Sequence, residues 1–318
     1  MSMNKVVTKN LDNEDLPDAT EGDRAQALGL KHFLRALLRD RVVLLSASFL
    51  LLLIFYAIFA EWMAPHDPLK QNLYTRLIPP FGSANVRGET QFHLLGTDQL
   101  GRDMLSRLIH GASVSLSVSL LGAAVSGAFG ITLGLIAGFY EGWVENIIMR
   151  FVDGFMAIPS LLTALFILFL LGSGFLNLIL VFVIIRWMVY ARVTRSLVIK
   201  FRGSTMVEAA QAIGAGNLRI IFVHLLPNLA SPLIALFTLE VAILIIAEAS
   251  LSFLGFGIQP PEPSWGGMIA RGREYITDAW WLVALPGFAI FLTALSLNLV
   301  ANWLRTVTDP ALRWRWML

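Results

Sequence analysis

Long apolar segments separated by polar ones dominate the chain after its first forty residues. A helix needs about 20 mainly apolar residues to cross the hydrocarbon core of a bilayer. Six segments meet this requirement, namely residues 42–60, 112–137, 147–171, 176–192, 233–256 and 282–304. The pattern therefore predicts an all-α membrane protein with six transmembrane helices.

The amino-acid composition also points to a membrane protein. Hydrophobic residues make up 56% of the 318 residues and charged residues only 14%, whereas soluble globular domains carry about 25% charged residues. We infer that lipid surrounds most of the chain. The absence of cysteine excludes disulfides, thiol nucleophiles and cysteine-based metal or redox sites. We predict neither a metal site nor a cofactor in this chain.

The distribution of lysine and arginine predicts the orientation of the spans. Most of the 24 basic residues fall on the side that holds the N-terminus, and such residues accumulate in cytoplasmic loops. Both termini and residues 193–231 are therefore expected in the cytoplasm, whereas residues 61–111 and 257–281 form periplasmic loops. Four tryptophans fall at predicted outer interfaces, as in an aromatic belt: Trp62, Trp265, Trp280 and Trp281.

The two ends of the chain differ from its apolar middle. Residues 1–27 are polar and lack apolar periodicity, which predicts a disordered cytoplasmic tail and not a cleavable signal. Within the region 28–60, residues 28–39 fit either an amphipathic helix on the membrane surface or a simple extension of the first span. The basic and aromatic tail, residues 311–318, is expected at the inner membrane surface.

The cytoplasmic segment between the fourth and fifth spans begins with signals for a short helix. Thr205 and Glu208 match a capping box, with Thr205 as N-cap and Glu208 three residues later. The helix is expected to run through Ile213 and to end at Gly214, because glycine favours the left-handed C′ position. Glu208 therefore either caps its own helix or contacts a partner as well.

A second short helix is expected directly after this turn. Asn217 can cap a helix over residues 218–226, which Pro227 would close. Three small side chains on the first helix leave room for a partner that binds helices in a groove, namely Ala209, Ala210 and Ala212. A rigid pair of helices of this kind can transmit a push to the spans on either side.

Together these residues resemble the EAA loop of bacterial ABC importer permeases, which forms the coupling helix that docks on the ATPase subunit. The family pattern is E-A-A, three residues, Gly, nine residues, Ile, one residue and Leu-Pro, and the chain departs from it at the isoleucine position. The sequence His-Leu-Leu-Pro-Asn over residues 224–228 resembles the dipeptide/oligopeptide/nickel branch of the family. The resemblance assigns ATPase coupling to Glu208, Ala209, Ala210, Gly214, His224, Leu226 and Pro227.

Two further segments resemble the same branch. Residues 95–103 match its G-T-D-x-x-G-R-D segment, and their charges predict a tight, salt-bridged outer turn in which Asp103 caps the next helix. Residues 255–266 match a proline-rich outer loop, stiff enough for a gate or for docking a binding protein. The resemblance covers residues 40–310 and departs at 301–305, where A-N-W-L-R replaces the common G-D-G-L-R.

The resemblance implies a type I ABC importer permease fold, with a core permease domain over residues 112–310 that includes a coupling loop over 194–231. Such a C-type transmembrane subunit is expected in the bacterial inner membrane with a sister permease, two ATPase subunits or domains, and a periplasmic or lipid-anchored substrate-binding protein. ATP and Mg²⁺ are expected on the ATPases. This chain lacks the phosphate-binding pattern G-x-x-x-x-G-K-[ST] and is expected not to be an enzyme.

Several substrates and one other functional class stay open at this point. The resemblance implies import of peptides or similar small solutes, with nickel, glutathione or an opine- or sugar-like compound as alternatives. A self-sufficient secondary transporter would use buried charges for ion coupling, but no inverted repeat is visible in the sequence. No H-E-x-x-H motif or Ser/His/Asp arrangement supports an intramembrane enzyme, and no nucleic-acid partner is expected.

Four ionisable residues fall within or beside the predicted spans: Arg186, Glu240, Glu248 and Asp153. Because a charge in the bilayer is costly, each marks either a structural ion pair or a transport pathway. Glu240 and Glu248 lie about 80° apart around a helix, so both can face the bundle interior, and one of them is expected to pair with Arg186. Asp153 has Arg150 three residues away as its candidate partner.

Small residues recur at every fourth position of the second predicted span, at Gly122, Ser126, Gly130, Gly134 and Gly138. This spacing lets another helix approach closely. The ladder is compatible with static helix packing and with movement in a gate, and packing is the simpler interpretation.

Overall fold

The computed structural model describes residues 37–86 and 89–308 of the chain. The chain divides into two units, residues 1–41 and 42–318, and the second contains the helices and strands that position the site. The predicted polar N-terminal tail, nearly all of the predicted amphipathic segment and the C-terminal tail lie outside the described residues.

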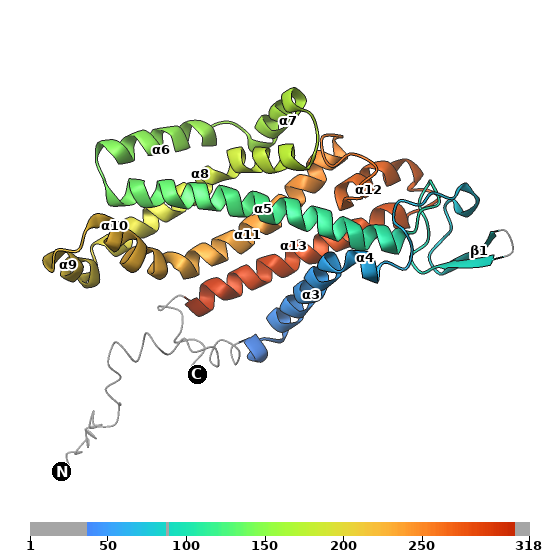
Figure 1. Cartoon of the computed structure of the whole chain (residues 1–318), viewed down its shortest axis with the longest axis horizontal. Coiled ribbons are helices and arrows are strands. Elements are labelled where there is room, and N and C mark those ends of the chain that lie inside the picture. The colour runs from blue at the N-terminus through green and yellow to red at the C-terminus, as the bar shows by residue number, and fades with distance from the viewer. Residues whose placement is uncertain (1–36, 87–88, 309–318) are drawn as a thin grey trace, which may run out of the picture. The chain divides into compact units, whose positions relative to one another are not determined.

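Five helices in the described part of the chain are long and apolar enough to cross a membrane. They are α3 (Arg41–Ile58), α5 (Met104–Phe139), α8 (Phe175–Arg202), α11 (Leu226–Phe253) with the turns before it, and α13 (Trp281–Thr308). Each coincides with a predicted span, and α5, α8 and α13 extend beyond it at both ends. Figure 1 shows α5, α8, α11 and α13 as one bundle.

The third predicted span is not a single helix. It consists of α6 (Trp143–Met156) and α7 (Ser160–Leu171), which meet at an angle of 83°. Pro159 explains the break, because its ring disfavours helical geometry in the preceding residue and its own backbone is extended, with ψ at 120°. The expected continuous helix over 147–171 is therefore wrong, and six spans are reached only if this bent pair counts as one.

The glycine ladder of α5 packs against α8. A Cβ atom at Gly130 would overlap the carbonyl oxygen of Trp187, and one at Gly134 would lie 2.6 Å from the carbonyl oxygen of Ala191. The two backbones thus approach as closely as small residues allow. Lipid is as apolar as leucine, so such van der Waals contact, and not the hydrophobic effect, holds helices together in a membrane. The ladder thus packs α5 closely against α8, as predicted.

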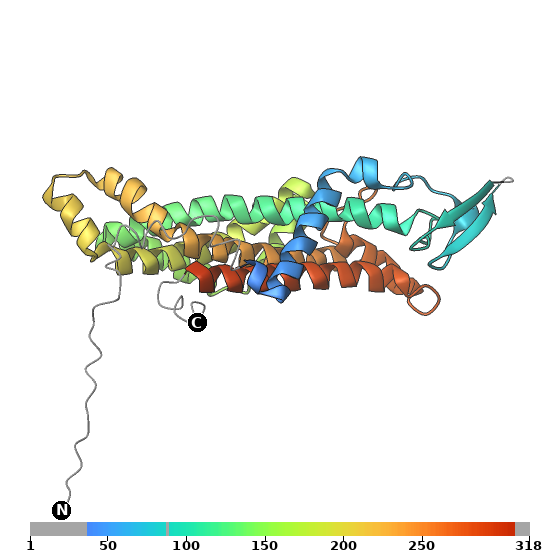
Figure 2. The same ribbon diagram turned by 90° about the horizontal axis from the view of Figure 1, so that it is seen from below.

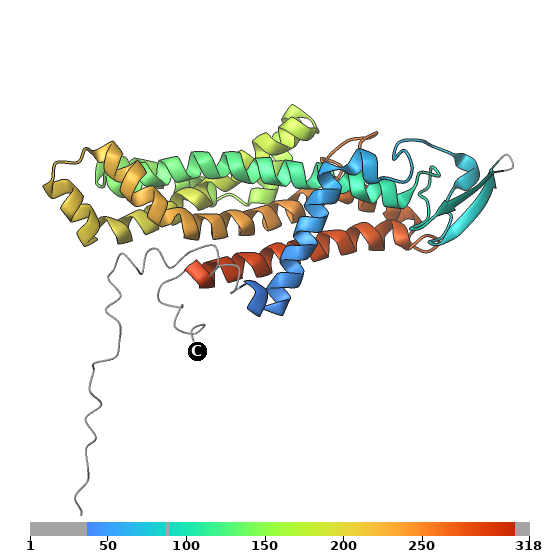
Figure 3. The same ribbon diagram turned by 60° about the horizontal axis from the view of Figure 1, so that its bottom comes forward.

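A buried apolar core joins three of the long helices. It includes Val118 of α5, Phe182 of α8, and Leu244 and Ile245 of α11, all nearly inaccessible to solvent. A second cluster anchors the start of α13 to the start of α5, and Leu53 of α3 packs against it. Figure 3 shows α3 running obliquely across α13. Apolar contacts therefore make up most of the core that holds these helices together.

One end of the bundle carries small elements that the hydropathy pattern did not predict. The first predicted outer loop contains α4 (Ala60–Met63), the 3₁₀ turn η1 (Leu73–Thr75) and the antiparallel strands β1 (Gly82–Val86) and β2 (Glu89–His93). The second contains α12 (Trp265–Gly272) and η3 (Arg273–Tyr275). We call this the hairpin end. The opposite end, seen in Figure 2, carries α9 (Thr205–Ala212) and is called the α9 end.

Candidate functional site

The helix α9 begins one residue earlier than a capping box at Thr205 requires. Ser204 is the N-cap residue, and its carbonyl oxygen accepts hydrogen bonds from the amides of Val207 and Glu208. Thr205 is then the first helical residue and Glu208 the fourth, so the reciprocal side-chain bonds of a capping box do not form. The predicted capping box is wrong, because the chain leaves α8 at Gly203 and turns into the new helix at Ser204.

The end of α9 matches the expectation. Gly214 has a φ of +80° and occupies the left-handed C′ position. Its amide donates to the carbonyl of Gln211 at 2.9 Å, and the next amide, of Ala215, donates to the carbonyl of Ala210 at 3.0 Å. These two bonds form a Schellman motif, which satisfies the last carbonyls of a helix. The sharp turn after α9 is thus built by glycine.

The second helix of the pair does not end at Pro227. Gly216, and not Asn217, is the N-cap of α10 (Asn217–Arg219), which passes through the π-helical turn η2 (Ile220–Leu225) directly into α11. Proline has no amide hydrogen and is tolerated in the first turn of a helix, which is where Pro227 lies in α11. The expected closed helix over 218–226 is therefore wrong, and the α9 end is continuous with a membrane span.

The coupling residues divide into inward and outward sets. Val207 and Ala210 of α9 are buried against Ile220 and Leu225 of η2, in a cluster that reaches α8 and α5. Glu208, Ala209, Ala212, Gly214 and Pro227 are exposed, while His224 and Leu226 are half-buried. Ala210 therefore serves internal packing, and the accessible small residues on this helix are Ala209 and Ala212.

Large apolar side chains accompany these exposed residues. Ile213 is 87% exposed and Leu218 is 68% exposed, although both lie on a surface otherwise rich in small and polar groups. Phe222 and Val223 of η2 are also exposed. Contiguous exposed apolar residues typically mark a contact surface. The sequence pattern did not single these residues out, since apolar side chains in short helical segments are usually expected in a core.

Arg186 forms an ion pair inside the bundle with Glu240, one of the two glutamates expected as its partner. The guanidinium Nε and Nη2 atoms each lie 2.6 Å from a different carboxylate oxygen of Glu240, so the pair is bidentate. The Glu240 side chain is buried, whereas that of Arg186 is 17% exposed and borders a cavity with Phe155 and Thr163. This geometry supports a structural pair that ties α8 to α11.

Glu248 makes a different set of contacts. Its Oε1 accepts a hydrogen bond from Ser252 Oγ at 2.7 Å and its Oε2 accepts one from Ser115 Oγ at 3.1 Å. The same Ser115 oxygen accepts from the backbone amide of Trp265. Glu248 thus joins α5, α11 and α12 without an arginine partner, a network that hydropathy alone does not reveal.

Asp153 does not pair with Arg150. It forms an ion pair with Arg192 of α8, and both side chains are largely exposed. Two further acidic residues bond to arginines farther along α8, Glu145 to Arg195 and Glu141 to Arg202. The pairing with Arg150 is therefore wrong, because the bend after α6 sets that helix against α8 and brings non-local partners into reach.

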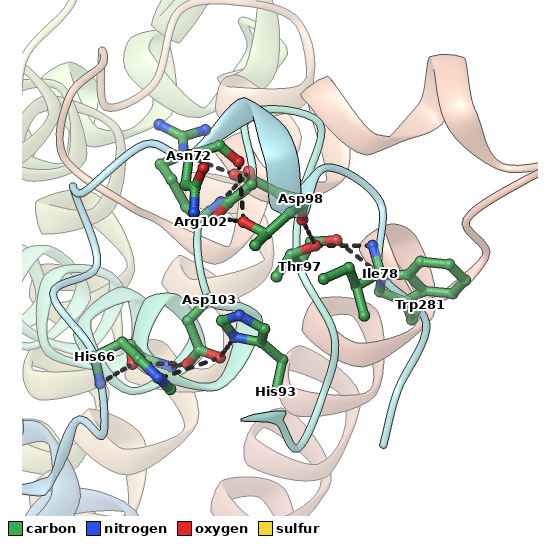
Figure 4. Close-up of polar contacts among 12 residues, drawn as sticks. His66, Asn72, Ile78, His93, Thr97, Asp98, Arg102, Asp103 and Trp281 are labelled. Carbon is green, nitrogen blue, oxygen red and sulfur yellow. Dashed lines mark hydrogen bonds and ion pairs between the residues drawn. The ribbon is translucent and has the colours of Figure 1, made fainter. Parts of the chain in front are cut away.

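The hairpin end contains a buried charge network, shown in Figure 4. The Asp98 carboxylate lies 2.7 Å from Arg102 Nε and 3.4 Å from Arg107 Nε, and all three side chains are buried. Asp98 and Arg107 line a small cavity together with Arg271 of α12. Burial lowers the pKa of the Arg271 guanidinium, and the like charge of Arg102 lowers it further. The predicted salt-bridged turn is confirmed.

The same turn positions the start of α5. Asp103 is its N-cap, and its Oδ2 accepts hydrogen bonds from the amide and the hydroxyl of Ser106 at 2.8 and 2.7 Å. Gly101 has a φ of +72°, and a Cβ there would overlap the carbonyl oxygen of Asn72. Trp281 of α13 donates to the Thr97 carbonyl at 3.1 Å, which anchors the last span to this turn.

Five apolar spans, a bent helix pair and a helical projection at one end are the features of a multi-pass membrane protein. The chain belongs to the family of binding-protein-dependent transport system inner membrane components, whose model matches residues 130–314. Residues 30–80 match a second model, the N-terminal transmembrane domain of oligopeptide transport permease C. The resemblance drawn from the EAA loop is thus confirmed.

Several relatives of the chain are named as permease proteins of transport systems. It is 44% identical to the di/tripeptide transport system permease protein DppC of Pseudomonas aeruginosa, over 89% of this chain and 93% of that protein. It is 36% identical to the glutathione transport system permease protein GsiD of Pectobacterium atrosepticum, over 92% and 94%. It is also 36% identical to the dipeptide transport system permease protein DppC of Haemophilus influenzae, over 86% and 92%.

A solved structure shares the fold. A chain of the MetNI methionine ABC transporter, solved in inward-facing conformations, superposes with a TM-score of 0.51 at 16% identity, covering 63% of this chain and 97% of the other. The predicted type I ABC permease fold is therefore confirmed.

Proposed function

We propose that this chain forms half of the translocation pathway of an ATP-driven, binding-protein-dependent importer of short peptides. The observation that carries the proposal is the α9 end. A short helix closed by Gly214 presents exposed residues, and the segment after it continues through η2 into α11. A soluble motor bound to α9 would therefore push directly on a membrane span. The chain itself has no phosphate-binding loop, so the motor belongs to partner subunits that bind ATP and Mg²⁺.

Each further partner has a surface suited to it. The α6–α7 pair exposes a row of apolar side chains, including Phe155, Ile158 and Leu162, which suits a sister permease. We assign the external substrate-binding protein to the hairpin end because this end lies opposite the α9 end. Basic residues near the α9 end, Lys200, Arg202 and Arg219, favour a cytoplasmic position for it in the bacterial inner membrane. Both termini would then lie in the cytoplasm.

The substrate class rests on the relatives. Their names specify di- and tripeptides, dipeptides and glutathione, all compounds with peptide bonds. We therefore favour short peptides over nickel, opine-like compounds or sugars. The bidentate pair of Arg186 and Glu240 removes two of the buried charges that a self-sufficient secondary transporter could use for ion coupling, and Glu248 is the remaining buried carboxyl.

Reconstitution of the full complex in proteoliposomes tests this function. A binding protein loaded with a dipeptide is expected to stimulate ATP hydrolysis and to drive uptake of labelled dipeptide, whereas free dipeptide alone is not. Uptake that persists after the ATPase subunits are inactivated would show a secondary transporter instead. Stimulation by nickel or glutathione but not by dipeptides would keep the permease role and change the substrate.

A further inference from the structure

Three potential metal ligands meet at the hairpin end, outside the coupling segment and the buried pairs of the bundle. His66 comes from the loop after α4, His93 is the last residue of β2, and Asp103 is the N-cap of α5. Each offers one ligand atom, and these atoms all lie within 4.8 Å of one another. Figure 4 shows both imidazole rings beside the Asp103 carboxylate.

The distances between these atoms fit a small cation. Nδ1 of His93 lies 2.9 Å from Oδ1 of Asp103, and Nδ1 of His66 lies 3.6 Å from the same oxygen. A tetrahedral Zn²⁺ with bonds of about 2.0 Å holds neighbouring ligand atoms about 3.3 Å apart. The two separations from Oδ1 lie on either side of this value, and the histidine ligand atoms lie within 4.8 Å of each other. The two imidazoles therefore close in by up to about 1.5 Å to hold an ion.

One imidazole nitrogen that faces the carboxylate lacks a hydrogen-bond partner. Nδ1 of His66 is buried and makes no hydrogen bond among the described residues, and its 3.6 Å separation from Oδ1 of Asp103 is too long for one. A buried polar atom without a partner is costly, and a ligand at this point would satisfy it. Nε2 of His93 is also buried and unpaired, but it lies on the far side of the ring from Nδ1 and cannot bind the same ion. The His93 ring is 4% exposed and the Asp103 carboxylate 2% exposed, so water does not reach these groups freely.

Neighbouring groups orient the carboxylate. Ser106 donates two hydrogen bonds to Oδ2 of Asp103, which leaves Oδ1 directed at the imidazoles. The Ser106 hydroxyl also accepts from the His66 backbone amide at 3.0 Å, which fixes the loop that carries this histidine. Such outer contacts preset the geometry of metal sites. Asp98 does not compete for the ion, because Arg102 and Arg107 occupy its carboxylate.

We propose that His66, His93 and Asp103 bind a divalent transition-metal ion, for which Zn²⁺ is the best match. Two imidazole nitrogens and one carboxylate oxygen are ligands that zinc accepts, and three protein ligands leave a fourth position for water. The ion takes the place of the hydrogen bond between Nδ1 of His93 and Asp103, and the single proton of the neutral ring then lies on Nε2. It joins the loop after α4, the β-hairpin and the start of α5.

Zinc titration of the purified full-length chain tests the site. Wild type is expected to bind one Zn²⁺ tightly. His66→Ala is expected to weaken zinc binding by about 100-fold or more, because the loss of a group that only supports a ligand already lowers metal affinity by about 10- to 100-fold. His66 is a suitable position because its side chain is 37% exposed and its hydrogen bond to Ser106 is made by the backbone, which alanine keeps. His110→Ala is the matched control, since that imidazole bonds to a backbone carbonyl.

Equal zinc affinity in wild type and His66→Ala would overturn the proposal, and so would the absence of stoichiometric binding. In either case the cluster would be a hydrogen-bonded pair of histidines on an aspartate and nothing more. Zinc is also expected to raise the melting temperature of wild type and of His110→Ala, but not of His66→Ala.

A second variant separates ligation from structural support. His66→Cys places a soft thiolate in the site, and the chain has no other cysteine to interfere. With Co²⁺ as the probe, this variant is expected to show a thiolate-to-cobalt charge-transfer band that wild type lacks. His110→Cys is expected to show none. Absence of the band in cobalt-loaded His66→Cys would place the ion elsewhere and overturn the assignment.

Discussion

The hairpin end and the α9 end both carry motifs of the same permease family, and their residues are placed in opposite ways. At the hairpin end, Asp98, Arg102 and Asp103 are buried and bonded to nearby groups. At the α9 end, Glu208 and Gly214 are exposed, and an added Cβ at Gly214 would meet no atom within 4 Å. A motif can therefore mark a buried scaffold at one place and an open contact surface at another.

The largest effect is expected at the hairpin end. Asp98→Ala leaves the buried Arg102 and Arg107 without their carboxylate, and breaking a buried pair in this way costs about 3–5 kcal/mol. Unfolding of the purified chain, followed by its melting temperature, measures the loss. Glu208→Ala is the control at the other end and should change the free energy of unfolding by less than about 0.5 kcal/mol. Equal stability of the two variants would contradict the comparison.

Two glycines with nearly the same backbone geometry sharpen the comparison. Gly101 and Gly214 have φ values of +72° and +80°, so alanine at either position costs about 1–2 kcal/mol in strain. At Gly101 the new methyl group also overlaps the Asn72 carbonyl, which adds about 1–3 kcal/mol. Denaturant unfolding should therefore show a larger loss of unfolding free energy for Gly101→Ala than for Gly214→Ala. The reverse ranking would show that Gly214 is packed in the folded protein.

A charge reversal at the α9 end should separate function from stability. Glu208→Arg is expected to leave the melting temperature unchanged but to reduce ATP-driven uptake at least about tenfold, a loss of ~1.4 kcal/mol in coupling. Gly214→Val should also uncouple transport while insertion stays intact. Glu61→Arg, an exposed charge reversal outside the motifs, serves as control. Normal coupling of ATP hydrolysis to uptake in Glu208→Arg would rule out the docking role.

The smallest effect is expected for an exposed ion pair. Asp153 and Arg192 are 60% and 44% exposed, and such pairs contribute about 0–1 kcal/mol. Asp153→Asn should therefore lower the free energy of unfolding only slightly, and high salt should abolish the difference from wild type. A loss above about 2 kcal/mol would mean that the pair is shielded from solvent in the assembled membrane protein.

Local sequence signals predicted the chain well wherever a structure depends on contiguous residues. The spans follow from hydropathy, the turn at Gly214 from glycine, and the start of α5 from Asp103. Predictions failed at element boundaries. Ser204 replaced Thr205 as N-cap, and Pro227 lies within the first turn of a helix that it was expected to close. In the first case the end of α8, and in the second the start of α11, sets the position of the turn.

The sequence by itself determined the number of apolar segments, the family and the residues of each motif, because these depend on composition and short spacings. Only the tertiary structure decided which charges meet. Arg186 and Glu240 are separated by 54 positions, and Arg192 and Asp153 by 39, so no local rule relates them. The His66 loop likewise reaches Asp103 only because the hairpin end folds back on α5. Long-range packing sets such contacts, and hydropathy carries no information about them.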